Sequence, residues 1–170
     1  MASRGAEKSR ALDDLLELAA TWSAVSRVLE KPLSDLGITL SQALALLAIE
    51  AAPQSLLIGG LAARLMQEPQ SVTSLMDRLE NAGLAQRMRD SVDRRAIRVG
   101  LTAAGLVQAE EVKRILTAAA EKVMALLDET VQAGLRVGVV TLYEACRSQP
   151  ESRLPALLGR AGSAAIPDGA

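Results

Sequence analysis

Residues 69–101 carry the pattern that most constrains this fold: an amphipathic helical segment that stops at a glycine and runs straight into an alternating segment. From Pro69 to Asn81 the apolar residues recur at i, i+3, i+4 and i+7, which is the period of one helix face, and proline suits a first helical position. Gly83 suits a left-handed stop. Residues 84–89 and 94–101 then alternate around an Asp-Ser-Val-Asp turn, which predicts a β-hairpin. This order favours a mainly α-helical fold with a small β-hairpin.

The outer face of the predicted helix over 69–81 is short and polar. It consists of Gln70, Ser71, Thr73, Ser74, Asp77 and Arg78. A solvated surface is the usual explanation of such a face, but Gln, Ser, Thr and Arg also pair with base edges in the major groove of DNA. Gln70, Ser71 and Ser74 lie near the helix start and are expected closest to the bases. Asp77 is expected to pair with a nearby arginine, since a carboxylate is repelled by anionic DNA.

Arginine is concentrated in the predicted hairpin, although the whole chain has a net charge of -1. Residues 84–100 hold five arginines against two aspartates, a local charge of five minus two, or +3; they are Arg87, Arg89, Arg94, Arg95 and Arg98, with Asp90 and Asp93. A nearly neutral chain does not coat nucleic acid indiscriminately. Any DNA binding therefore depends on this local patch, in which Arg87, Arg89 and Arg98 are either phosphate contacts or ordinary surface charges.

Three further helical segments and a short strand are expected before residue 69. Residues 11–30 carry apolar positions at three- and four-residue steps, and Pro32 is expected to end that helix. Thr39 and Gln42 have the spacing of a capping box, which predicts a helix over 40–51. A strand at 55–57 and a helix at 60–66 follow.

Two more helices are expected after the hairpin. Thr102 is placed to cap a long helix that runs to about Leu127, and residues 131–147 form the last helix. The two ends of the chain, residues 1–10 and 148–170, have no sustained apolar period and are expected to be flexible.

The composition argues against several classes of protein. The chain has no histidine and a single cysteine, Cys146, so it cannot form a His/Cys metal cluster or use a histidine as a proton shuttle. We therefore expect no enzyme activity, no cofactor and no metal. No signal peptide and no run of 18 apolar residues is present, so a cytoplasmic protein with no membrane partner is the simple interpretation.

Several short motifs, in this order and spacing, resemble the MarR family of bacterial regulators, named for multiple antibiotic resistance. They are Gly37-Ile38-Thr39-Leu40-Ser41-Gln42, Leu61-Ala62, Asp77-Arg78-Leu79-Glu80-Asn81-Ala82-Gly83-Leu84, Asp93-Arg94-Arg95 and Leu101-Thr102-Ala103-Ala104-Gly105. The resemblance covers about 37 to 105, and the flanking helices extend it to about 11 to 147.

The resemblance implies a winged helix-turn-helix head over 38–102 and a homodimer formed by helices at 11–31 and 103–147. The expected function is sequence-specific binding to double-stranded DNA at a near-palindromic operator. The expected regulator is a repressor that a small-molecule effector releases. The expected DNA-binding residues are Gln70, Ser71, Thr73, Ser74, Arg78, Arg87, Arg89, Arg94, Arg95 and Arg98. In the wing, Asp93 would orient Arg95, and Arg94 or Arg95 would enter the minor groove.

Some features allow more than one interpretation. Gly59-Gly60 stands where the family often has a Ser or Thr cap, so the helix at 60–66 is expected to start loosely. Cys146 is expected to pack rather than to sense redox state, and Trp22 to pack in the core or dimer rather than to line an effector pocket. The alternative functions are a winged-helix module for protein interaction and a constitutive DNA binder without an effector.

Overall fold

The computed structural model describes residues 2–52, 55–90 and 96–148, with side chains from residue 10 onward. The predicted wing residues Asp93, Arg94 and Arg95 and the tail beyond Ser148 lie outside the described residues. Along the chain the elements are α1 (Ala2–Leu33), the short 3-10 helix η1 (Ser34–Leu36), α2 (Leu40–Glu50), β1 (Leu56–Leu57), α3 (Ile58–Leu65), α4 (Pro69–Asn81), β2 (Ala85–Arg89), β3 (Ile97–Leu101), α5 (Ala103–Met124) and α6 (Glu129–Arg147).

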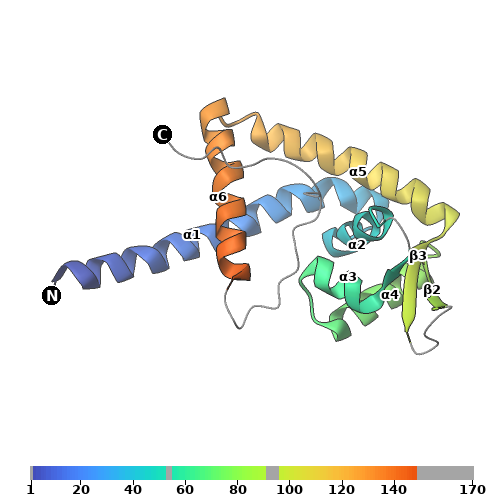
Figure 1. The fold of residues 1–170 in the computed structure, drawn as a ribbon. Coiled ribbons are helices and arrows are strands. Elements are labelled where there is room, and N and C mark those ends of the chain that lie inside the picture. Colours follow the sequence, from blue (N-terminus) through green and yellow to red (C-terminus); the bar gives the residue numbers. More distant parts are fainter. Residues whose placement is uncertain (1, 53–54, 91–95, 149–170) are drawn as a thin grey trace, which may run out of the picture.

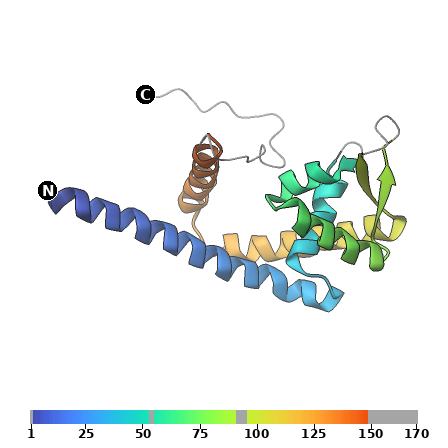
Figure 2. The same cartoon turned by 90° about the horizontal axis from the view of Figure 1, so that it is seen from below.

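The elements form a small head with two long helices that leave it (Figure 1). Helices α2, α3 and α4 and the three strands gather at one end of the molecule, and α1 and α5 lie side by side where they join the head. Figure 2 shows that α6 turns away from α5 and stands apart from the head. In the described chain α6 buries none of its residues.

The core lies inside the head. The predicted inner face of α4 is confirmed, because Val72, Leu75, Met76 and Leu79 are all buried. They pack in one cluster with Leu46 of α2, Leu61 of α3 and Val99 of β3. Burial of a side chain of this size contributes about 1.5–3 kcal/mol, so the core fixes where the polar face of α4 points.

The strands form an antiparallel sheet in the order β1-β3-β2, with Val99 of β3 opposite both Leu56 and Arg87. The predicted hairpin and the short strand before α3 are thereby confirmed. Gly83 takes the expected left-handed conformation with φ 71, which ends α4 and turns the chain into β2.

Thr102 joins the start of α5 to the end of the α4 segment. Its hydroxyl donates to Gly83 O at 2.6 Å and accepts from Gly105 N at 3.0 Å, and its backbone N–H donates to Leu84 O at 3.1 Å. A Cβ atom on Gly105 would lie 1.8 Å from Leu84 O, so only glycine fits there. This contact explains physically why a Thr-Ala-Ala-Gly sequence begins the helix.

The helix starts differ from expectation in two places. Helix α1 begins at Ala2 rather than at Ala11, so the segment expected to be flexible is helical, and Pro32 lies inside its last turn instead of ending it. The helix nevertheless ends only one residue later, at Leu33, where η1 follows. Helix α3 begins at Ile58, and its N-cap Leu57 makes no side-chain cap bond. The missing cap is thus confirmed, but Gly59-Gly60 lie within the first turn.

The caps of the other helices agree with the sequence. Thr39 and Gln42 form the complete capping box of α2, in which Gln42 N donates to Thr39 Oγ1 at 3.2 Å and Thr39 N donates to Gln42 Oε1 at 3.0 Å. Asp128 caps α6 by accepting from Val131 N at 2.9 Å, and α6 begins at Glu129, two residues before the expected start at 131. Helix α5 ends at Met124, three residues before the expected Leu127.

The expected packing of Cys146 is wrong for the single chain, in which this cysteine is exposed. The reason is that α6 has no neighbouring helix to pack on. Trp22 likewise has no place in the core, and 57% of its surface is exposed.

Candidate nucleic-acid interface

The polar face of α4 is exposed over its whole length. Pro69 occupies the first turn as predicted, and the buried apolar face turns the opposite side outward. The exposed residues are Gln70, Ser71, Thr73, Ser74, Asp77 and Arg78. Together with α3 and the turn at Met66–Glu68, this arrangement is a helix-turn-helix whose second helix presents hydrogen-bonding groups to solvent.

Internal hydrogen bonds determine what this face can offer to a ligand. Thr73 Oγ1 donates to Pro69 O at 2.9 Å and Ser74 Oγ donates to Gln70 O at 3.4 Å, so each hydroxyl proton is used within the helix. Both hydroxyls keep lone pairs that accept. Arg78 Nε donates to Ser74 O at 3.3 Å, which leaves its terminal nitrogens for outside acceptors. The face therefore combines acceptors, an amide and a guanidinium.

Arg87 is directed inward, onto α4. Its Nη1 forms ion pairs with Glu80 and with Asp77, the latter at 2.8 Å, and its Nη2 donates to Thr73 O at 2.9 Å. Its backbone N–H also donates to Glu80 Oε1 at 2.7 Å. The pairing expected for Asp77 is confirmed. Arg87 joins the first wing strand to α4, and only 21% of its side chain is exposed.

Arg98 lies on the opposite face of the sheet from Val99, and its side chain is engaged by groups beside the two outer strands. It forms an ion pair with Asp90, and its Nη1 donates to Ser55 O at 2.6 Å. Asp90 is 6% exposed, the one charged residue that is buried among the described residues. Arg89, by contrast, is exposed, as is Arg78. Among the described arginines of the predicted site, the structure thus keeps Arg78 and Arg89 at the surface and engages Arg87 and Arg98 inside the head.

Sequence reasoning missed Glu80 and Asp90 as members of the site. Glu80 lies one helical turn after Asp77, so its place beside the hairpin could have been inferred from the spacing. Asp90 carries no such signal, because neither its burial nor its ion pair with Arg98, eight residues later, follows from a local sequence pattern.

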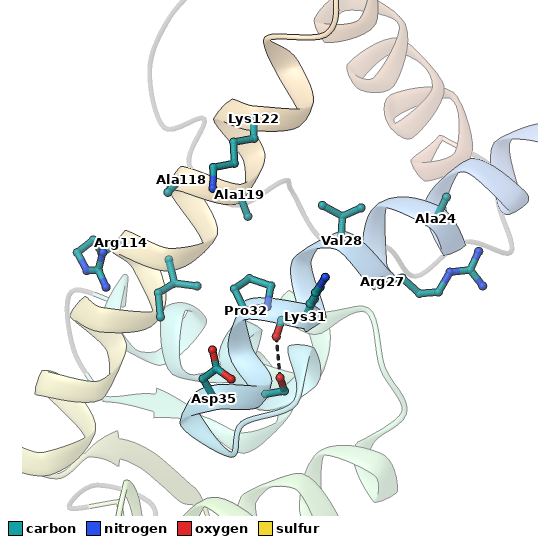
Figure 3. A pocket seen from close by; sticks show the side chains of 12 residues that line it. Ala24, Arg27, Val28, Lys31, Pro32, Asp35, Arg114, Ala118, Ala119 and Lys122 are labelled. Atoms are coloured by element: carbon teal, nitrogen blue, oxygen red, sulfur yellow. Dashed lines mark hydrogen bonds between the residues drawn. The ribbon is translucent and has the colours of Figure 1, made fainter.

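Two hollows lie where the long helices meet the head. One of about 770 Å³ lies between α1 and α5, and Figure 3 shows Val28 of α1 and Ala119 of α5 beside it, with Lys31 and Lys122 at its margin. The other, of about 760 Å³, is lined by α1, α2, α5 and the end of α3. It includes Trp22 of α1 and Met66 of the turn that leads into α4. Trp22 therefore lines a hollow beside the head, although from the sequence it is expected to pack in the core or in the dimer.

Two other kinds of site receive no support in the part of the chain that the structure describes. No group of three or more His, Cys, Asp or Glu side chains is placed to hold a metal ion. No single helix there has the length and hydropathy to cross a membrane, and one bent pair, Arg10–Leu36 with Leu40–Glu50, meets those criteria only in combination.

Comparison with known proteins agrees with this geometry. A model of the MarR family matches residues 36–96, which include α2 to β2 and end one residue before β3. No curated protein sequence matches the chain. Many solved structures share the fold.

Three of these solved structures are informative. AbsC, a MarR family transcriptional regulator from Streptomyces coelicolor, is 25% identical with a TM-score of 0.72, and the match covers 82% of this chain and 93% of AbsC. FabT from Streptococcus pneumoniae, in complex with DNA, is 24% identical with a TM-score of 0.67, and the match covers 79% of this chain and 96% of FabT. CouR from Rhodococcus jostii RHA1, bound to p-coumaroyl-CoA, is 21% identical with a TM-score of 0.64, and the match covers 74% of this chain and 87% of CouR.

Proposed function

We propose that this chain, which has the fold and the matched head of a MarR family transcription regulator, binds double-stranded DNA in a sequence-specific manner and controls transcription. The observation that carries the proposal is the fully exposed polar face of α4, held beside a two-stranded wing by Arg87. The head would comprise residues 38–102, and the helices at 11–31 and 103–147 would form the dimer. FabT, which shares the fold, is seen in complex with DNA.

In this proposal α4 reads bases in the major groove. Gln70 and Ser71 lie in its first turns, where a recognition helix comes closest to base edges. Gln70 offers both a donor and an acceptor, which suits bidentate pairing with adenine, and the acceptor lone pairs of Thr73 and Ser74 complete the reading face. Arg78 is placed further along the helix, where a cation suits a backbone phosphate.

The wing would bind the DNA flank next to α4. Exposed Arg89 is the last residue of β2 and is proposed as a phosphate contact. Arg94 or Arg95 would enter the minor groove, with Asp93 orienting Arg95; these three residues lie outside the described structure. Narrow minor grooves concentrate negative potential, so an arginine there favours A/T-rich flanks.

A homodimer is proposed because the helices outside the head expose unpartnered apolar surface. The exposed side chains include Leu12, Leu15, Leu16 and Trp22 on α1 and Val131, Leu135, Val139 and Leu142 on α6. Large apolar side chains exposed repeatedly along a helix are typical of an interaction site. Two heads related by a two-fold axis would contact half-sites roughly 34–36 Å apart, which is one turn of DNA.

The proposed regulation is repression that a small-molecule effector relieves. The hollow of about 760 Å³ supports this proposal because it is lined by α1, by α2 and by the Met66 turn before α4. An effector bound there would contact both a dimer helix and the support of the reading helix, so it can favour a dimer form that does not fit DNA. CouR, which shares the fold, is seen with p-coumaroyl-CoA.

Selection from a pool of random-sequence duplexes tests DNA reading and needs no defined operator. We expect the full-length protein to enrich a two-fold symmetric sequence and to bind it far more tightly than a scrambled duplex of equal length. Affinity should fall steeply with salt because bound phosphates release counterions. If no sequence is enriched, the winged head serves protein interaction instead.

Trp22 gives a direct test of the effector proposal, because it is the one tryptophan in the chain and it lines the hollow. Its fluorescence is recorded while a metabolite panel that includes p-coumaroyl-CoA is titrated, and release of the labelled, selected duplex is measured in parallel. We expect one compound to shift the fluorescence and release the duplex at the same concentration. If none of the panel releases DNA, the protein is a constitutive binder.

A further inference from the structure

Asp90 occupies an unusual position at the root of the wing. It directly follows the last residue of β2, Arg89, and its backbone N–H donates to Ala96 O at 3.0 Å, one residue before β3 begins. Its carboxylate is 6% exposed. A buried carboxylate requires a close cationic partner, because its loss of hydration is otherwise very costly.

Arg98 supplies that partner from the central strand of the sheet. Its Nε donates to Asp90 Oδ2, which lies at the end of β2, while its Nη1 donates to Ser55 O at 2.6 Å, just before β1. Arg98 is also the register partner of Leu57 in β1 and of Met88 in β2. One guanidinium therefore connects the two outer strands across β3.

The strand on the Ser55 side leads directly into the helix-turn-helix, because β1 ends at Leu57 and α3 begins at Ile58. The contact on the other side holds Asp90, the residue that follows β2, the first strand of the wing. Arg98 therefore links the wing to the start of the helix-turn-helix, in addition to the link from Arg87 to α4. The planar fork of arginine serves two acceptors at fixed angles, which the single ammonium group of lysine cannot reproduce.

We infer that Arg98 is a positioning residue that orients the wing through Asp90 and the Ser55 carbonyl, and that it does not bind a DNA phosphate. The inference rests on the proposed function and revises the role that the sequence suggested for this arginine. Two of the three guanidinium nitrogens, Nε and Nη1, donate to Asp90 and to Ser55 O, and two thirds of the side chain is covered, since 33% is exposed. Arg89, nine residues earlier in the hairpin, provides the contrast because it is exposed.

The test compares Arg98→Gln, Arg98→Lys and the control Arg89→Gln on the duplex that the wild-type protein selects. Fluorescence anisotropy gives the affinity at several salt concentrations. For Arg89→Gln we expect the slope of log K against log salt to fall by about 0.9, the value for one phosphate contact. For both Arg98 variants we expect affinity to fall roughly tenfold, as for loss of one charge-assisted hydrogen bond, with an unchanged slope.

Footprinting distinguishes positioning of the wing from general weakening of the head. At saturating protein, the Arg98 variants should lose hydroxyl-radical protection at the outer flanks of the site, where the wing binds. They should keep protection of guanine N7 in the major groove, where α4 binds. A merely destabilised head would lose both kinds of protection together.

Several results would overturn the inference. If Arg98→Lys binds with wild-type affinity, or if the Arg98 variants keep the flank protection, Arg98 does not position the wing. If their salt slope falls as it does in Arg89→Gln, Arg98 is a phosphate contact. If Arg98→Gln does not fold, Asp90→Asn is measured instead. Weaker DNA binding by Asp90→Asn supports the positioning role, because the contact between Asp90 and Arg98 is weakened. Tighter binding would show that the released Arg98 binds a phosphate. Failure of the wild-type protein to select any duplex would instead refute the proposed function.

Discussion

Arg87 of β2 lies against Asp77 of α4, with Arg87 Nη1 2.8 Å from Asp77 Oδ1. The same guanidinium contacts Glu80 and the Thr73 carbonyl, so three positions on α4 hold the first strand of the wing. The reading helix and the wing are thereby joined by a side chain, in addition to the short turn at Gly83. This relationship holds β2 against α4 within the head.

Replacement of Arg87 by glutamine should destabilise the head. The change leaves Glu80 and Asp77 without their common cation and removes the hydrogen bond to Thr73 O. Because these groups are partly exposed, we expect a loss of about 1–3 kcal/mol in the free energy of unfolding. Unfolding in urea measures this free energy. The control Arg89→Gln, in the same strand but exposed, should change stability by less than about 0.5 kcal/mol. Equal effects of the two variants would contradict the inward role of Arg87.

Gly105→Ala should be among the most damaging small substitutions in the chain. The added Cβ would lie 1.8 Å from the backbone oxygen of Leu84, which cannot move without separating α5 from the end of the α4 segment. We expect a loss of more than about 2 kcal/mol by urea unfolding. The matched control is Gly134→Ala in α6, where the new methyl group meets open space and should stabilise the helix by up to about 1 kcal/mol.

Met66→Gly should raise the thermal midpoint. Met66 holds a left-handed conformation with φ 52 in the turn between α3 and α4, and over half of its surface, 54%, is exposed. A side chain in this conformation costs about 1–2 kcal/mol, which glycine avoids, and part of the gain is offset by the greater freedom of unfolded glycine. Ala63→Gly, at an exposed position inside α3, should instead lower stability by about 1 kcal/mol. A fall in the midpoint for both variants would contradict the strain at Met66.

The success and failure of sequence-based prediction follow the range of the interactions involved. The bounds of α4 are local properties, set by Pro69, by the apolar period and by Gly83, and the structure reproduces them. The inward direction of Arg98 depends on Ser55, 43 residues away, and no local pattern carries that information. Arg87, Arg89 and Arg98 are therefore equivalent in the sequence, each a phosphate contact or an ordinary surface charge.

Other misses have different causes. Residues 1–10 were expected to be flexible because they are polar, but Ala, Glu, Lys and Arg are good helix formers, and α1 extends to Ala2. The exposure of Cys146 and Trp22 depends on what covers α1 and α6, which the sequence of one chain does not specify.

Leu135→Glu should convert the protein to a monomer. Val131, Leu135, Val139 and Leu142 share one face of α6, and a glutamate at its centre would bring a charge into the proposed dimer interface. Sedimentation velocity should give a species of twice 17.9 kDa for the wild type and one chain for the variant. Val137→Glu is the control, because Val137 lies on the opposite face and is 67% exposed. Loss of the dimer in both variants, or in neither, would contradict the proposed face.

The most direct test of the central claim is a footprint of the wild-type protein and of Gln70→Ala on the selected duplex. We expect two protected major-groove patches with centres roughly one helical turn, about 10–10.5 base pairs, apart. Gln70→Ala should weaken binding by about 1–3 kcal/mol and relax the preference at one symmetric base-pair position, with the salt slope unchanged. A single protected patch, or a variant that keeps the full sequence preference, would contradict the claim that α4 of a dimer reads the DNA.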